Sequence, residues 1–118
     1  MNIDECIAKG LLKRDKPDIE KAKKSIETAK YKLEIAKREF DAGIYEGAII
    51  SAYNAMFHAA RALLYKDGFK ERSHYALFIY ISEKYGDKLE KRFIHELETL
   101  RIERHEMRFQ LQMILSMQ

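Results

Sequence analysis

One segment limits the folds open to this chain more than any other. Residues 47–65 read GAIISAYNAMFHAARALLY, and nearly all of them are apolar. A helix that is apolar on most of its faces is surrounded by other helices in a globular protein. We therefore expect this segment to be the central helix of an α-helical domain.

The few polar residues of this segment form a single file. Ser51, Asn54, His58 and Arg61 are spaced 3, 4 and 3 residues apart, so they share one face of a helix. An unpaired buried polar group costs about 1–3 kcal/mol, and the file must therefore meet polar partners, water or a ligand. We predict that it forms a cleft wall or a dimer face. The alternative is a hydrogen-bonded polar layer inside the bundle.

The segments before the central helix also have a helical period. Residues 2–13 predict a short amphipathic helix, and Pro17 suits the first turn of a long second helix that ends at residues 41–43. The apolar residues of the second helix alternate at spacings of 3 and 4, which is typical of a helix in a bundle. Its expected inward residues are Ile19, Ala22, Ile26, Ala29, Leu33, Ala36 and Phe40.

The segments after the central helix predict two more helices. The central helix should end at Asp67-Gly68, and residues 69–72 should form a charged loop. Ser73 is the expected N-cap of a short helix, and Asp87 with Glu90 predicts a capping box for a last helix that runs to about residue 115. No segment alternates with the two-residue period of a strand. We predict one all-α domain over residues 1–118, an up-and-down bundle of four or five helices.

Composition excludes several classes of protein. The chain has 22 Lys and Arg against 19 Asp and Glu, a mild excess that allows a nucleic-acid partner without requiring one. Its one cysteine, Cys6, rules out a disulfide-stapled secreted scaffold. We find no signal peptide and no run of apolar residues long enough to span a membrane, and so expect a cytoplasmic protein.

The last helix carries a basic cluster of Arg101, Arg104, His105 and Arg108. Arginines can hold a phosphate group through paired hydrogen bonds, and a histidine can act as acid or base near neutral pH. Arg101, Arg104 and His105 are therefore the candidate catalytic residues for cleaving RNA without a metal, and Arg108 is assigned to the cleft or dimer face. In the alternative interpretation, Arg104 pairs with a carboxylate or reaches water.

Motifs for metals and cofactors are missing. Glu71-x-x-His74 copies half of a di-iron motif, but it occurs once and is expected in a loop. The chain has no pair of cysteines and no glycine-rich phosphate loop. We expect no metal and no cofactor.

Residues 52–86 read AYNAMFHAARALLYKDGFKERSHYALFIYISEKYG. This block resembles the HEPN family, small helical domains named for higher eukaryotes and prokaryotes nucleotide-binding. The resemblance depends on the helix containing Met56-Phe57-His58, the start at Ser73-His74 and the arginine-rich last helix, and it covers about residues 20–115.

The resemblance implies a helical bundle that forms a homodimer. Many small prokaryotic HEPN proteins are encoded beside a minimal nucleotidyltransferase, with which they form a toxin–antitoxin pair. Active members are metal-independent RNases, with an arginine, four to six residues and a histidine on the last helix, and both chains of the dimer contribute to the site. Here Arg101 and His105 have three residues between them, so the motif is not intact and catalysis stays open.

The expected function is therefore that of a partner of a minimal nucleotidyltransferase, with nucleotide or RNA binding in a polar cleft between the central and last helices. Two alternatives remain. One is a metal-independent RNase toxin with a composite dimer site, and the other is a non-catalytic helical interaction module.

Overall fold

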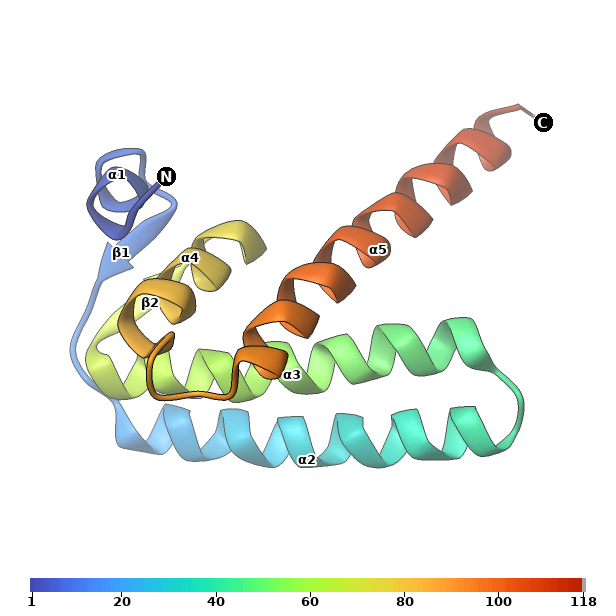
Figure 1. Cartoon of the computed structure of the whole chain (residues 1–118), viewed down its shortest axis with the longest axis horizontal. Coiled ribbons are helices and arrows are strands. Elements are labelled where there is room, and N and C mark those ends of the chain that lie inside the picture. The colour runs from blue at the N-terminus through green and yellow to red at the C-terminus, as the bar shows by residue number, and fades with distance from the viewer. Residues whose placement is uncertain (118) are drawn as a thin grey trace.

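The computed structural model describes residues 1–117, and the helices account for most of them. The elements in chain order are α1 (Ile3–Ala8), β1 (Leu12–Arg14), α2 (Ile19–Asp41), α3 (Tyr45–Asp67), β2 (Phe69–Glu71), α4 (His74–Tyr85) and α5 (Lys91–Ser116). Figure 1 shows α2 and α3 as a long antiparallel hairpin, with α4 on the side of α3 away from α2 and the last turns of α5 projecting from the bundle. The predicted all-α bundle is confirmed.

The core lies where α3 meets α4 and the first half of α5. Tyr53 and Leu64 of α3 and Leu97 of α5 are almost completely buried. They pack in one cluster with Leu77 and Ile81 of α4. The expectation of a central helix is therefore confirmed for the sides of α3 that face α2, α4 and α5, and α3 is the element against which α4 and α5 pack.

Local sequence signals set several of the helix ends as expected. The Ser73 side chain accepts a hydrogen bond from the Ala76 amide at 3.0 Å and caps α4. Gly68 ends α3 with φ of +85°, and a Cβ atom there would lie 2.7 Å from the Asp15 carbonyl oxygen. Only glycine adopts this conformation without cost, and here it also allows the close approach of the chain.

The predicted helix over residues 2–13 is wrong in its second half. Gly10, with φ of +73°, follows the end of α1, and the chain continues as strand β1. This strand pairs antiparallel with β2, Leu12 opposite Glu71 and Arg14 opposite Phe69, so the expected loop at 69–72 is mostly strand. Strands of three residues are too short for a two-residue period to be visible, and the pairing partner is distant in sequence.

Two helix starts also differ from the predictions. α2 begins at Ile19, because Asp18 caps it through the Lys21 amide at 3.0 Å, and Pro17 precedes the cap. The capping box from Asp87 to Glu90 does not form, and α5 begins at Lys91 without a side-chain cap. The amides of residues 88 and 89 both bond to the Tyr85 carbonyl at 2.9 Å, so the chain is still turning at the end of α4 where the box was expected.

The predicted inward seam of α2 is only half correct. Ala29 and Ala36 are buried, whereas the large residues of the same seam, Ile26, Leu33 and Phe40, have exposed fractions of 39, 45 and 62%. α2 packs chiefly against α3, so only the side of the seam nearest α3 is covered. No helix in residues 1–117 has the length and apolar character needed to cross a membrane.

The burial of α5 predicts a contrast between two leucines of this helix. Leu97 is 1% exposed and Leu115 is 59% exposed. Leu97→Ala should lower the free energy of unfolding by about 2–5 kcal/mol, because it leaves a cavity in the core. The matched control Leu115→Ala should change it by less than about 0.5 kcal/mol. Urea unfolding measures both, and equal losses would mean that α5 is not docked through Leu97.

Candidate functional site

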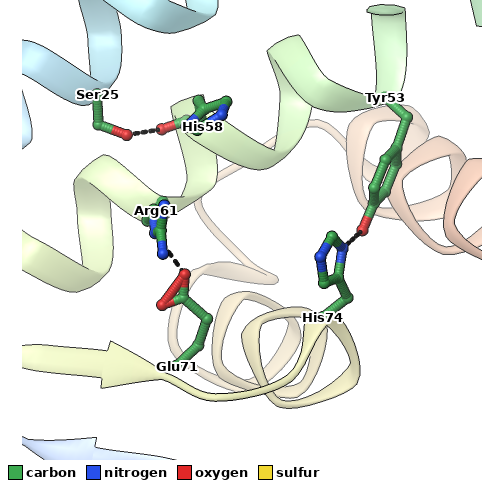
Figure 2. Close-up of polar contacts among 6 residues, drawn as sticks. All are labelled: Ser25, Tyr53, His58, Arg61, Glu71 and His74. Atoms are coloured by element: carbon green, nitrogen blue, oxygen red, sulfur yellow. Dashed lines mark hydrogen bonds and ion pairs between the residues drawn. The ribbon is translucent and has the colours of Figure 1, made fainter. Parts of the chain in front are cut away.

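A histidine at the start of α4 is stacked against two aromatic rings of α3. The His74 ring lies 4.2 Å from the Phe57 ring and 5.6 Å from the Tyr53 ring, at an interplanar angle of 20° in both pairs. The Tyr53 hydroxyl is 2.7 Å from Nδ1 of His74, as Figure 2 shows. Tyr53 and Phe57 are four residues apart on α3, so they present neighbouring rings to the same residue.

An ion pair holds the segment before His74 against α3. Nε of Arg61 lies 2.5 Å from Oε1 of Glu71, whose side chain is 3% exposed. Glu71 ends β2, so this pair and the pairing with β1 together fix where α4 starts. Removing one partner would leave a buried charge uncompensated, which typically costs about 3–5 kcal/mol.

Arginines from two helices surround the stacked rings. Cζ of Arg104 is 5.8 Å from the Tyr53 ring centroid, and Cζ of Arg61 is 5.5 Å from that of Phe57. Cζ of Arg101 lies 5.4 Å from the Tyr75 ring centroid. These contacts have cation–π geometry. We call this group the His74 cluster, and its members are Tyr53, Phe57, Arg61, Glu71, His74, Tyr75, Arg101 and Arg104.

The environment of His74 favours its neutral form. Burial, followed by the positive charges of Arg104, Arg61, Arg101 and Arg108, lowers the pKa of His74 to about 4. Burial raises the pKa of Tyr53 to about 12, although Arg104 and Arg101 oppose the shift. Both groups are neutral at pH 7. When the Tyr53 hydroxyl donates to Nδ1, the proton of His74 resides on Nε2.

Positive charge in the cluster exceeds negative charge. Glu71 is paired with Arg61, whereas Arg101, Arg104 and Arg108 form no ion pair within residues 1–117. Nε of Arg101 is buried and has no hydrogen-bond partner in the same part of the chain. A buried donor without a partner is costly, so an acceptor such as a phosphate oxygen would stabilise it.

The HEPN domain family matches residues 22–110, well over half of the chain. The chain belongs to the HEPN family. No curated protein and no solved structure matches it. HEPN domains commonly dimerise, and the family is all-α, in agreement with the helical bundle described above.

The predicted polar file of this HEPN domain is divided between two sides of α3. Ser51 donates a hydrogen bond to Glu39 of α2. The His58 carbonyl oxygen accepts one from Ser25 of α2 at 2.6 Å. Burial, Arg61 and Lys32 together lower the pKa of His58. Figure 2 shows the Ser25–His58 contact and the Arg61–Glu71 contact at separate places along α3.

Of the file, Arg61 alone is a member of the His74 cluster. Arg61 lies four residues after Phe57 and three after His58, so it belongs to both lines of side chains on α3. Asn54 is half-buried on the same helix. The prediction that the whole file forms a cleft wall or dimer face therefore remains a prediction for Ser51, Asn54 and His58.

The predicted residues of α5 meet different surroundings. Arg101 and Arg104 are half-buried and contact the aromatic rings, and Arg108 is exposed but close enough to affect His74. His105 is exposed and lines a shallow hollow with Glu106, Phe109 and Gln110. The histidine that the arginines surround is therefore His74 of α4.

Sequence reasoning missed His74 and its two aromatic partners as site residues. The available signal was the spacing of Tyr53, Phe57 and Arg61, four residues apart on one face of α3. Glu71 and His74, which resemble half of a metal motif, bond to different residues of α3. In residues 1–117, no group of three His, Cys, Asp or Glu side chains is placed to hold a metal ion.

The low pKa of His74 predicts a pH-dependent stability. The folded protein has a pKa of about 4 at this site, and the unfolded chain one of about 6.5. The unfolded state therefore binds more protons between these values, and stability falls as the pH drops from 6.5 toward 4. In urea unfolding at pH 7 and at pH 5, the wild type should lose more stability than His74→Gln. Equal losses, or an NMR titration midpoint of His74 at or above 6.5, would contradict the assignment.

Proposed function

We propose that this HEPN protein binds RNA or a nucleotide through phosphate contacts at the His74 cluster. The observation that carries the proposal is the set of arginines from α3 and α5 that converge on His74. Two of them, Arg101 and Arg104, have no carboxylate partner in residues 1–117. Such an excess of positive charge suits an anion.

The chemistry of the cluster fits a phosphate ester. A guanidinium presents paired donors to phosphate oxygens, and Arg101 and Arg104 are one turn apart on α5. Nε2 of a neutral His74 adds a donor that carries no charge of its own. Tyr75 is half-buried beside Arg101 and offers a ring on which a base can stack.

We further propose that the protein acts as a dimer, in the cytoplasm, and in a toxin–antitoxin-type pair with a minimal nucleotidyltransferase. Membership of the HEPN family supports this part of the proposal. A nucleotidyltransferase encoded by the adjacent gene, and co-purifying with this chain, would support the pairing. An isolated gene would argue against it.

A second candidate is a metal-independent RNase. Arg101 and His105 are four residues apart on α5, and the exposure of His105 leaves it accessible to a substrate. In such a reaction the 2′-oxygen of the RNA attacks the adjacent phosphorus and loses its proton to a base. The 5′-oxygen leaves with a proton from an acid, and the arginines stabilise the charge that develops on the phosphate.

Binding at the His74 cluster predicts a salt-dependent affinity that depends on Arg104. Titration of the purified chain with a single-stranded RNA should show binding that weakens with salt. Arg104→Ala should weaken binding about 10- to 100-fold, the expected loss of a charged hydrogen bond of about 1.5–3 kcal/mol, and should reduce the salt slope.

Arg92→Ala is the matched control, because Arg92 is an exposed arginine near the start of the same helix. It should bind RNA nearly as the wild type does. Equal weakening by the two variants would show that binding is diffuse, and wild-type protein without salt-dependent binding would refute the proposal.

The RNase candidate predicts cleavage that survives EDTA and requires His105. If the wild type cleaves RNA in EDTA, His105→Ala should lower the rate by about 100-fold or more, the usual contribution of a general acid or base. His95→Ala, which changes an exposed histidine elsewhere on α5, should leave the rate unchanged. Cleavage that both variants retain would remove His105 from the mechanism.

A further inference from the structure

The α2–α3 hairpin has one long side on which large apolar side chains are exposed, and within residues 1–117 α5 borders this side at one end through Leu100. On α2 the side chains of Ile19, Ile26, Leu33 and Phe40 are 51, 39, 45 and 62% exposed. On α3, Tyr45 is 61% exposed, and its ring packs edge-on against that of Phe40 at 5.5 Å. Large apolar side chains exposed in one line are unusual on a monomer and mark an interaction surface.

Two hollows lie along this side, one toward each end of the hairpin. The first, of about 630 Å³, lies next to the α2–α3 turn, and its lining includes Phe40, Tyr45, Ile49 and Ala52. The second, of about 490 Å³, lies toward the other end, and its lining includes Ile26, Ala59 and Leu63. Small alanines between larger apolar residues form holes into which side chains of another helix fit.

The sequence of α2 along this side repeats every seven residues. Each of the first three repeats has a large apolar residue, an acidic residue directly after it, an alanine three places on and a lysine four places on, and the fourth begins with Phe40 and Asp41 only. The apolar positions are 19, 26, 33 and 40, the acidic positions are 20, 27, 34 and 41, the alanines are 22, 29 and 36, and the lysines are 23, 30 and 37. Ala29 and Ala36 of the repeat are buried, whereas its large residues are exposed and can pack against another helix.

α3 has the same period toward the same side. Its residues 45, 49, 52, 56, 59 and 63 alternate at spacings of 4 and 3, and all but one of them line the two hollows. The hairpin therefore presents two parallel stripes with a coiled-coil period. A stripe of this kind packs best against another of the same period.

We infer that this apolar side of the α2–α3 hairpin is the dimer face, and that its occupant is the same hairpin of a second copy. The two hairpins form a four-helix bundle around a two-fold axis. The inference rests on the dimer that we propose above and names its surface, and it does not depend on phosphate binding at the His74 cluster.

The size of the surface agrees with this occupant. Each helix of the hairpin has 23 residues. The hairpin side is therefore about 34 Å long and about 20 Å wide, close to 700 Å², and a stable interface buries about 800 Å² on each partner. The exposed end of α5 after Met107 is also apolar and is the rival occupant. Its length is about 15 Å, so it would cover less than half of the hairpin side. A two-fold dimer, the commonest oligomer, pairs the whole surface with itself.

The experiment measures the dimer dissociation constant of the full chain by sedimentation. Leu33→Glu and Ile26→Glu place a carboxylate on the apolar side of the hairpin, at positions that are already partly exposed, so both variants should still fold. Each should raise the dissociation constant about 100-fold, because a charge would be buried without a partner.

The control is Tyr31→Glu, since Tyr31 is 59% exposed and lies on the opposite face of α2 from Leu33. It should leave the dimer unchanged, and circular dichroism checks that all variants are folded.

Several results would overturn the inference. If the wild-type chain is monomeric at about 100 µM, a concentration well above the dissociation constants of specific dimers, the hairpin side is not a dimer face. This conclusion holds even if the Leu33 and Ile26 variants no longer bind a nucleotidyltransferase partner. A dimer that survives both of these substitutions but dissociates in Ile114→Glu is held by the end of α5. Equal effects of the Leu33, Ile26 and Tyr31 variants would show a non-specific response to charge. RNA titration of the same samples distinguishes the two proposals. A dimer that depends on Leu33 and Ile26 but does not bind RNA would refute phosphate binding at the His74 cluster and would leave the dimer face in place.

Discussion

The burial of α3 is the constraint on which the other elements depend. α2 covers one side of this helix, and α4 with the first half of α5 covers another, so the buried side chains of α3 and α4 meet in one core. Gly68 ends it with a left-handed turn, which brings the chain back along α3 as β2 and α4. Residues far apart in the sequence meet because each of them packs on this one helix.

The His74 cluster is a consequence of that arrangement. Tyr53 and Phe57 turn toward α4 and receive the His74 ring, and α5 crosses nearby with Arg101 and Arg104. Arg101 and Arg104 lie on aromatic rings and form no ion pair with a carboxylate within residues 1–117. Their charge and the burial keep His74 neutral. The cluster therefore combines positive charge with an uncharged donor in a half-buried place.

Predictions from the sequence succeeded where the signal was local. Ser73 as a cap and Gly68 as a helix end depend on a few adjacent residues, and both are confirmed. The failures occurred where a distant partner decides. β1 exists because β2 lies beside it, and the large residues of α2 are exposed because, within residues 1–117, α2 packs chiefly against α3 and only on its alanine side. A heptad pattern indicates that a helix packs against something, but it does not say in which molecule.

The sequence by itself determined the helical class, the central place of α3, the HEPN family and the presence of arginines on the last helix. Only the tertiary structure decided which face of α3 meets which neighbour. On a helix the lines Ser51–His58 and Tyr53–Phe57 point to different sides, because Ser51 and Tyr53 are about 200° apart around the axis, and the period alone does not say which side meets α2 and which meets α4. The Ser51 side chain bonds to Glu39 of α2 and the His58 side chain is affected by Lys32 of the same helix, whereas the Tyr53 and Phe57 rings stack on His74 of α4. Arg61, which belongs to both lines, joins the His74 cluster through its ion pair with Glu71.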